Sequence, residues 1–206
     1  MIAIVDYGVG NLFSLRCSLQ SLGLETAVTA EPEMIRKADR VILPGVGAFG
    51  DAIDKLRATG LDRIVLAEAA SGKPLLGICL GMQLLFDKSY EFGEHEGLGL
   101  LHGSVVPMQG SIPPELKIPQ MGWNALIKKR SHPLLNDVKE GDCVYFVHSF
   151  YAADCDDSLV ATTEYGREMT AVVAKDNVMG CQFHPVKSGS VGLKILLAFS
   201  AMTCSG

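Results

Sequence analysis

The first 90 residues alternate short apolar runs with longer stretches of helical period, and few architectures accommodate this alternation. The apolar runs predict four strands, over residues 2–5, 26–29, 40–43 and 74–78. The stretches between them predict helices over residues 11–22, 51–57 and 62–70. Strands that alternate with helices form βαβ units, in which the strands run parallel and the helices cover the sheet. The sequence therefore predicts an α/β fold with a mostly parallel central sheet flanked by helices.

The helix predicted over residues 11–22 has recognisable ends. Its apolar positions recur every three or four residues, at Leu12, Leu15, Leu19 and Leu22. Asn11 belongs to the residue types that cap helix N-termini with their side chains, and Gly23 stands where a helix commonly ends. We therefore expect Asn11 to cap this helix and the leucines to face the sheet.

From residue 98 onward, glycine and proline separate shorter β-rich runs. These runs cover residues 126–127, 143–150, 159–163, 170–174 and 178–183. They predict a largely antiparallel β extension of the sheet. A last helix, over residues 191–202, is predicted to pack on the sheet through Leu193, Leu196, Leu197 and Ser200. No linker composition divides the 206 residues, so we expect a single domain over residues 1–206.

Charge and composition exclude several kinds of partner. Lysine and arginine (18) against aspartate and glutamate (23) give a net charge of −5, and the longest basic run is Lys128-Lys129-Arg130. Such a chain is a poor match for a nucleic-acid backbone. It has no apolar run near the roughly 18 residues of a membrane span and no basic leader before Asp6, so we expect a cytoplasmic protein without membrane contact. The six cysteines lack CxxC spacing, so we expect reduced thiols and no metal site.

An apolar run meets a predicted helix at Gly77-Ile-Cys79-Leu-Gly81. This spacing is typical of a nucleophile elbow, a sharp turn that holds its central residue in a strained conformation at the edge of a sheet. A helix that starts after Cys79 would lower the pKa of its thiol. Cys79 is therefore a candidate nucleophile, and the alternative is a small buried side chain between two packing glycines.

A thiol nucleophile needs a base, and the sequence offers five histidines. His184 directly follows the run 178–183, where a strand end could hold it rigidly. His148 is the competitor, because it also lies in a β-rich run. The remaining histidines have polar, loop-like surroundings and are expected at the surface, at positions His95, His102 and His132. Because spacing does not settle which histidine meets Cys79, its pairing with His184 is a spatial hypothesis.

A glycine-rich segment follows the strand predicted over residues 40–43. Gly45, Gly47 and Gly50 satisfy the G-x-G-x-x-G pattern of dinucleotide sites. The pattern follows the third strand rather than the first, however, and Glu68 lies in a helical stretch rather than at a strand end. We therefore expect no cofactor. The backbone amides of this loop and of Leu80 are instead predicted to face an oxyanion opposite Cys79.

The one tryptophan, Trp123, lies in Gln120-Met-Gly-Trp-Asn124. A single tryptophan usually belongs to the core. The alternative is an anchor at an interface, where tryptophan and methionine are enriched.

Together these segments resemble the class I glutamine amidotransferases and, within that class, the glutaminase subunits of imidazole glycerol phosphate synthases. The matching motifs are Asp6-Tyr-Gly-Val-Gly-Asn11, Leu43-Pro-Gly-Val-Gly47, Gly77-Ile-Cys-Leu-Gly-Met-Gln83, Pro119-Gln-Met-Gly-Trp-Asn124, Tyr145-Phe-Val-His-Ser149, Thr162-Thr-Glu-Tyr-Gly166 and Gln182-Phe-His-Pro185. They follow one another in family order across nearly the whole chain. The resemblance implies a flavodoxin-like, three-layer α/β fold.

The resemblance also implies a glutaminase. Cys79 would attack the side-chain carboxamide of glutamine, His184 would deliver a proton to the departing ammonia, and water would hydrolyse the thioester. The positions that match oxyanion-binding and substrate-binding residues are Val46, Gly47, Leu80, Gln83, His148, Ser149 and Phe150.

A partner follows from the same resemblance. Ammonia released into water would be protonated, so the family docks this domain, as a heterodimer, on a cyclase with a (β/α)8 barrel that forms imidazole glycerol phosphate in histidine biosynthesis. We expect hydrolysis to require that partner. The positions that match the interface are Asn11, Met121, Gly122, Trp123 and Asn124.

Three positions depart from the family pattern. Val186 stands where the family has glutamate, so the carboxylate that would orient His184 is missing. In Ser-His-Asp enzymes, breaking the orienting contact lowers turnover about 10⁴-fold. A thiol depends less on this contact, so we expect impaired rather than absent hydrolysis. Gln120 replaces a frequent histidine and Phe150 the usual tyrosine.

The sequence leaves open whether another carboxylate, such as Glu168, approaches His184. Two other functions also stay open. Val186 is compatible with a subunit that binds an ammonia-using cyclase without hydrolysing glutamine. A different class I amidotransferase, or a cysteine hydrolase of related fold, would instead associate with another synthase.

Overall fold

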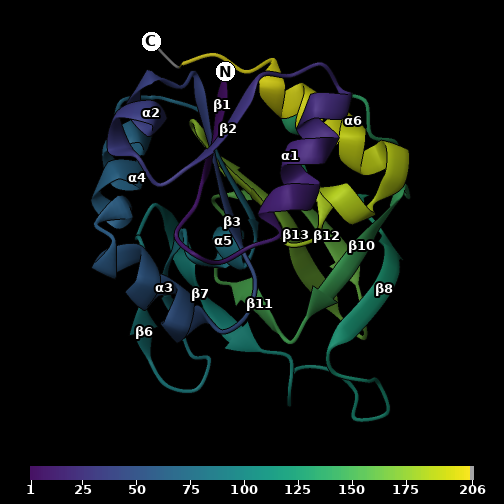
Figure 1. The fold of residues 1–206 in the computed structure, drawn as a ribbon. Coiled ribbons are helices and arrows are strands. Elements are labelled where there is room, and N and C mark those ends of the chain that lie inside the picture. Colours follow the sequence, from purple (N-terminus) through teal and green to yellow (C-terminus); the bar gives the residue numbers. More distant parts are fainter. Residues whose placement is uncertain (205–206) are drawn as a thin grey trace.

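The computed structural model describes residues 1–204, and an eight-stranded sheet forms its centre (Figure 1). Five strands run parallel, in the order β2 (Thr26–Thr29), β1 (Ile2–Val5), β3 (Arg40–Gly45), β4 (Leu75–Cys79) and β14 (Val178–Cys181). Antiparallel strands continue the sheet through β13 (Glu168–Lys175), β12 (Leu159–Glu164) and β9 (Ile127–Lys128). The mostly parallel sheet with an antiparallel extension is therefore confirmed.

Helices cover both faces of this sheet, which gives three layers (Figure 1). Successive side chains of a strand point to opposite faces. In β1, Ile2 and Ile4 pack with α1 (Leu12–Ser21) and α6 (Gly189–Ser200), whereas Ala3 and Val5 pack on the other side. That second side is covered by α2 (Pro32–Lys37), α3 (Phe49–Ala58) and α4 (Leu61–Ala70). The three-layer α/β fold is confirmed.

Two smaller sheets complete the β structure. One has the order β11 (Phe150–Ala153), β7 (Leu101–Pro107), β5 (Phe86–Ser89) and β6 (His95–Glu96). The other pairs β8 (Gln120–Ala125) with β10 (Cys143–His148). Only the pairing of β5 with β7 is parallel among these strands of residues 1–204. The single strand predicted over residues 143–150 is divided at Ser149, and its halves, β10 and β11, join different sheets.

The sequence prediction has no counterpart of helix α2 or of strands β5, β6, β7 and β8. In β8 the usual polarity is inverted, because Gln120 is fully buried while Met121 and Trp123 are exposed. An alternation of buried polar and exposed apolar residues hides a strand from pattern analysis. Helix α2 buries only Ile35 of its six residues, so it carries no helical period that could predict it.

Two details of the predicted helices are wrong. Asn11 occupies the N-cap position of α1, but its side chain makes no capping hydrogen bond, and only its backbone carbonyl accepts the amide of Leu15 (3.2 Å). In α6, Leu196 is buried as predicted, beside Ile195 and Phe199. Leu197, however, lies two residues from both Ile195 and Phe199, about 200° around the helix, and is 47% exposed. No helix within residues 1–204, α6 included, is long and apolar enough to cross a membrane.

Candidate active site

Cys79 lies at the junction between β4 and the one-turn helix α5 (Leu80–Gln83), at the carboxyl edge of the parallel strands. Its backbone has φ 56° and ψ −115°, a conformation that is strained for any residue with a side chain. A Cβ on Gly77 would lie 2.7 Å from the carbonyl oxygen of Gly81, and one on Gly81 would lie 1.8 Å from that of Leu43. Glycine is therefore required on both sides of Cys79, and the predicted elbow is confirmed.

A cavity of about 310 Å³ opens above this elbow, and we call it the elbow cavity. It gathers segments that are far apart in the sequence. It is lined by Cys79 and His184. It is also lined by every position expected to bind substrate, namely Val46, Gly47, Leu80, Gln83, His148, Ser149 and Phe150. The structure thus brings together all the catalytic and substrate-binding positions predicted from the sequence except Val186. The predicted surface histidines do not line it, and of these His102 is exposed while His95 and His132 are half-buried.

The Cys79 thiol is buried, and the side-chain amide of Gln182 donates to its Sγ over 3.8 Å. Burial raises the pKa of the thiol to about 11, although the amide of Leu80, the Gln182 side chain and the charge of Lys187 each lower it. The predicted decrease in pKa is therefore wrong. Helix α5 has only four residues, and its positive end does not compensate for removing a thiolate from water.

His184 follows β14 and starts the 3₁₀ turn η2 (Pro185–Lys187). Its backbone is fixed on both sides, because its amide donates to the carbonyl of Tyr145 (3.0 Å) and its carbonyl accepts the hydroxyl of Ser188 (2.7 Å). His184 is a buried residue, and its imidazole has no hydrogen-bond partner among residues 1–204. Burial, together with the charge of Lys187, lowers its pKa to about 4. His184 is therefore neutral near pH 7.

No acidic side chain of residues 1–204 takes the orienting role that the resemblance gives to a glutamate at position 186. Glu168, which the sequence left open for this role, forms an ion pair with Lys129 (2.6 Å) and accepts the hydroxyl of Thr162 (3.3 Å). No acidic group contributes to the pKa of His184. Val186 is half-buried in η2 and packs against the core on the α1 and α6 side of the sheet.

The competing histidine, His148, uses both of its ring nitrogens within the protein. Nδ1 lies 2.8 Å from the carbonyl of Phe150 and Nε2 lies 2.9 Å from the side-chain oxygen of Gln120. Burial lowers its pKa to about 4 as well. His148 therefore forms part of the cavity wall and has no free nitrogen for the thiol. Gln120 is thus the anchor of His148.

Gln83 connects the elbow to the opposite wall. Its amide nitrogen donates to the carbonyl of Phe150 (3.1 Å) and to the side-chain oxygen of Gln182 (3.0 Å). Gln182 in turn contacts Cys79, so one chain of side-chain amides holds the cavity wall against the nucleophile. The sequence analysis quoted Gln182 as part of a motif but gave it no role, although a polar residue inside the apolar run 178–183 is a signal that could have found it.

Glu91 is the site residue that sequence reasoning missed most clearly. It lines the elbow cavity, half-buried, and its Oε2 accepts the backbone amide of Phe49 (2.7 Å). Burial raises the pKa of its carboxyl. Its only local signal is an acidic residue between two aromatic ones, Tyr90 and Phe92, in a turn.

The glycine-rich loop after β3 lies against the elbow rather than around a dinucleotide. Gly45 is paired with Cys79 in the β3–β4 register, and a Cβ on it would lie 2.7 Å from the amide of Gly81. Gly47 has φ +92° and lines the elbow cavity. Glu68, the acidic residue considered for a ribose, forms an ion pair with Lys73. This loop therefore presents its backbone to the space above Cys79.

Trp123 does not belong to the core. It is 56% exposed, and its neighbour Met121 is 64% exposed on the same strand. The indole meets the ring of Tyr145 edge to face, with centroids 6.0 Å apart, and the ammonium of Lys187 lies 5.5 Å from the Tyr145 ring. Asn11 is exposed as well, whereas Gly122 and Asn124 are half-buried. The core interpretation of Trp123 is therefore wrong.

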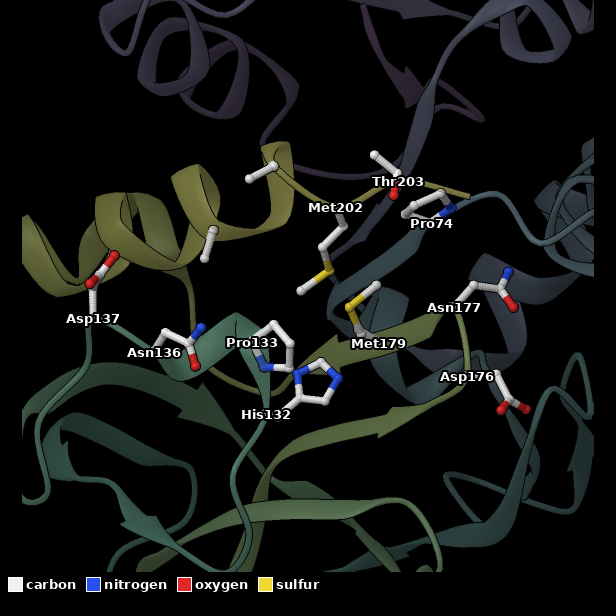
Figure 2. Close-up of a pocket in the computed structure, with 12 residues that line it drawn as sticks. Pro74, His132, Pro133, Asn136, Asp137, Asp176, Asn177, Met179, Met202 and Thr203 are labelled. Carbon is white, nitrogen blue, oxygen red and sulfur yellow. The ribbon is translucent and has the colours of Figure 1, made fainter. Parts of the chain in front are cut away.

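A larger cavity, of about 460 Å³, lies at the opposite edge of the sheet, beside the starts of β4 and β14 (Figure 2). Pro74, Met179 and Met202 are among its walls, with polar groups from His132 and Asn177. The Asn177 amide donates to the carbonyls of Ala69 and Lys73, and His132 accepts the amide of Leu134. The Asn177 and His132 side chains thus serve the local backbone, and no cysteine of residues 1–204 is among the lining residues.

Comparison with known proteins supports one family. The model of the family described as glutamine amidotransferase class-I matches residues 3–200. The imidazole glycerol phosphate synthase subunit HisH of Wolinella succinogenes is 50% identical over 201 residues, covering 97% of this chain and 98% of that protein. The subunit of the same name from Sulfurimonas denitrificans is 51% identical over 203 residues, covering 97% of both.

Among solved structures, PurLQS from Thermotoga maritima aligns with a TM-score of 0.74 at 21% identity, over 97% of this chain and 96% of that one. At this identity the likeness shows the fold alone.

Proposed function

Because the chain belongs to the class-I glutamine amidotransferase family, we propose that it is the glutaminase subunit of an imidazole glycerol phosphate synthase and that it acts in the cytoplasm. It would hydrolyse glutamine to glutamate and ammonia and pass the ammonia to a cyclase. The observation that carries the proposal is the elbow cavity, in which a strained cysteine, a histidine with free ring nitrogens and a half-buried carboxylate share one space of about 310 Å³. This volume suits a small polar substrate.

Substrate binding would use Glu91 and the loop after β3. A half-buried carboxylate with a raised pKa gains by pairing with a cation, and the α-ammonium of glutamine supplies one. Gly47 and Leu80 line the elbow cavity, and their backbone amides would hold the carboxamide oxygen as it becomes an oxyanion. One such donor is worth about 10²–10³-fold in turnover in other enzymes.

The chemical steps would pass one proton back and forth. The Cys79 thiol gives its proton to His184, and the sulfur attacks the carboxamide carbon of glutamine. Imidazolium then donates this proton to the leaving nitrogen, which departs as ammonia, and a thioester remains. A water molecule, deprotonated by His184, attacks the thioester, and the returning proton regenerates the thiol as glutamate leaves.

The resting pair of Cys79 and His184 is neutral. Their pKa values, about 11 and about 4, strongly favour thiol and imidazole over thiolate and imidazolium. The proton transfer therefore needs a stabilising anion near His184 or a change that accompanies docking. This requirement agrees with the expectation that hydrolysis depends on the cyclase and is impaired by Val186.

The cyclase, a (β/α)8 barrel by the family resemblance, would dock on Met121 and Trp123 of β8 together with Asn11. We call these three residues the docking surface. Large exposed apolar side chains such as those of Met121 and Trp123 are typical of interface anchors. A bound cyclase would receive ammonia before water protonates it.

The test is glutamine hydrolysis by this chain mixed with its cyclase and the nucleotide substrate of the cyclase. Val186→Glu and Cys79→Ala are assayed beside the parent. We expect Val186→Glu to be much faster than the parent, and the parent to exceed Cys79→Ala. If all three have the same background rate while the cyclase still uses free ammonia in the complex, the glutaminase function is wrong.

That outcome would support the second candidate, a subunit that binds the cyclase without hydrolysing glutamine. The observation that favours it is the imidazole of His184, which has no acceptor among residues 1–204. A glutamine analogue that reacts covalently with Cys79 at an ordinary rate would contradict the second candidate.

A further inference from the structure

The side chain of Gln182 is buried directly beside the nucleophile. Gln182 follows strand β14, which pairs in parallel with β4 so that Cys181 lies opposite Ile78. The next residues of the two segments, Gln182 and Cys79, are therefore neighbours as well. The backbone amide of Gln182 donates to the carbonyl of Ala171 (2.9 Å), and the residue is fully buried. The sheet itself thus holds this side chain beside the thiol.

The neighbours of Gln182 decide which end of its amide faces the sulfur. A side-chain amide has a donor end and an acceptor end, and only its hydrogen-bond partners tell them apart. The backbone carbonyl of Phe150 can only accept, so the amide nitrogen of Gln83 must face it, over 3.1 Å. The same nitrogen also donates to the side-chain oxygen of Gln182, over 3.0 Å. With its oxygen engaged, Gln182 turns its nitrogen to the Sγ of Cys79, over 3.8 Å.

This direction favours one protonation state of Cys79. A neutral thiol is a weak acceptor, whereas hydrogen bonds to an ionised group are about twice as strong as those between neutral groups. The contact from Gln182 therefore strengthens when Cys79 loses its proton. In agreement with this geometry, Gln182 is among the groups that lower the pKa of the thiol, although burial outweighs them.

Gln182 can also keep this contact while glutamine is bound. The backbone amide of Leu80 is the other hydrogen-bond donor that lowers the pKa of Cys79, and Lys187 acts through its charge. In the proposed function, the amide of Leu80 is engaged by the carboxamide oxygen of the substrate. The side chain of Gln182 lies behind the elbow and is not among the residues that line the elbow cavity, so the substrate leaves it in place.

We propose that Gln182 is a catalytic residue whose amide stabilises the negative sulfur of Cys79, and that Gln83 holds this amide in the donating orientation. This inference rests on the proposed glutaminase function. When the thiol proton passes to His184, the electron pair left on the sulfur accepts from Gln182. When water hydrolyses the thioester, the C–S bond breaks and its electron pair returns to the sulfur. The same contact therefore helps the thiolate to leave before His184 returns its proton.

The first test measures the thiol without glutamine. Iodoacetamide alkylates a thiolate and releases iodide, and peptide mass spectrometry follows Cys79 separately from the other cysteines. Gln182→Met keeps the length of the side chain and removes the donor, which should raise the pKa of Cys79 by about one unit. A thiolate of higher pKa is also more nucleophilic, so the alkylation rate near pH 8 should fall about threefold rather than tenfold. An unchanged rate would overturn the proposal.

Two controls separate this effect from a general loss of structure. The exposed Cys143 of the same chain should react at the parent rate in every variant. Thr163→Val removes a fully buried hydroxyl that donates to the carbonyl of Ala125 (2.9 Å), on a strand that β14 and β13 separate from β4. It should leave the alkylation of Cys79 unchanged. If Thr163→Val slows that reaction as much as Gln182→Met does, the effect is structural and the proposal is wrong.

A double-mutant cycle tests the orienting role of Gln83. Gln83→Met frees the amide of Gln182 to turn, so it should slow the alkylation of Cys79 by less than Gln182→Met does. In the background of Gln182→Met, the same substitution should have no further effect, because there is no amide left to orient. Additive effects of the two substitutions would contradict the proposed orientation by Gln83.

Glutamine hydrolysis by the complex with its cyclase connects the thiol to turnover. Gln182→Met should lower kcat about tenfold, the factor that corresponds to one pKa unit, and keep the KM for glutamine within about twofold. A kcat equal to that of the parent would overturn the proposal and leave the glutaminase function standing. If Gln182→Met slows alkylation while the parent hydrolyses no faster than Cys79→Ala, the proposed function is wrong and the contact of Gln182 with the thiolate is supported.

Discussion

Ser188 gives the sharpest test of how the fold positions His184. Its hydroxyl is buried, donates to the carbonyl of His184 (2.7 Å) and accepts the backbone amide of Tyr145 (2.9 Å). It thereby ties the turn η2 to strand β10. The substitution Ser188→Ala removes both hydrogen bonds and adds no new group.

The two bonds differ in what their loss costs. The carbonyl of His184 keeps a second donor, the amide of Lys187 (3.0 Å), whereas the amide of Tyr145 loses its partner. A buried orphan donor costs about 1–3 kcal/mol and a lost hydrogen bond about 1 kcal/mol, so Ser188→Ala should destabilise the fold by about 2–4 kcal/mol. For a chain of this size that corresponds to about 4–16 °C in melting temperature.

Turnover should fall more than stability alone explains. Misplacing a reacting group by about 1 Å can cost 10²-fold, so we expect kcat of the complex to fall between about 10-fold and 100-fold. The KM for glutamine should stay within about twofold, because Ser188 does not line the elbow cavity. The assays are urea unfolding of the chain and glutamine hydrolysis by the complex.

A matched control is Ser158→Ala. Ser158 is also fully buried, but its hydroxyl donates only to the carbonyl of Cys155 (3.2 Å), far along the sheet from His184. It should lose about 1 kcal/mol of stability with kcat unchanged. If Ser188→Ala kept the parent's kcat, or if Ser158→Ala lost as much kcat, the link from Ser188 to His184 would be refuted.

Three further predictions concern charge, substrate and partner. The rings of His148 and His184 are neutral in the folded chain, with pKa values of about 4, and would take up protons once unfolded, near pH 6.5. Between pH 6.5 and 4 the unfolded state therefore binds more protons than the folded state. The free energy of unfolding should fall as the pH drops through this range, by up to about 3 kcal/mol for each ring. Urea unfolding at a series of pH values measures this decrease. Glu91→Gln should raise the KM for glutamine tenfold or more with kcat little changed, and an unchanged KM would exclude Glu91 from substrate binding. Trp123→Ala should weaken cyclase binding by about 2 kcal/mol, or about 30-fold in Kd by calorimetry, while the melting temperature stays the same because the indole is exposed.

The sequence predicted those elements whose signal is local and apolar. Strands β1 to β4 are short runs of β-branched and apolar residues, a pattern that predicts buried strands. β1, β3 and β4 are buried along nearly their whole length, whereas β2 is half-buried. Strand β8 escaped because its exposed residues, Met121 and Trp123, are reserved for a surface that another molecule would cover. A pattern rule assumes that apolar residues face the interior of the same chain, and an interface strand violates that assumption.

The site divides in the same way. The elbow could be identified because Gly77, Cys79 and Gly81 lie within five consecutive residues. The steric need for glycine acts between near neighbours. Glu91 could not, since an acidic residue in a turn has no local pattern and becomes part of the site only through the cavity that distant segments form. The orientation of His184 likewise depends on Tyr145 and Ser188, which come from another strand and the next turn.

The protonation of Cys79 shows why charge is harder to predict than geometry. From the sequence, a helix starting after the cysteine argues for a lowered pKa of its thiol, and the helix does start there. The opposing effect is burial of the thiol, which outweighs the amide of Leu80 and raises the pKa to about 11. The cavity around the thiol is lined by the loop after β3, by α5, by the loop before β8 and by the β10–β11 junction. Burial also lowers the pKa of His184. The elbow is therefore encoded by adjacent residues, whereas the neutral state of its catalytic pair arises only when the whole cavity has assembled.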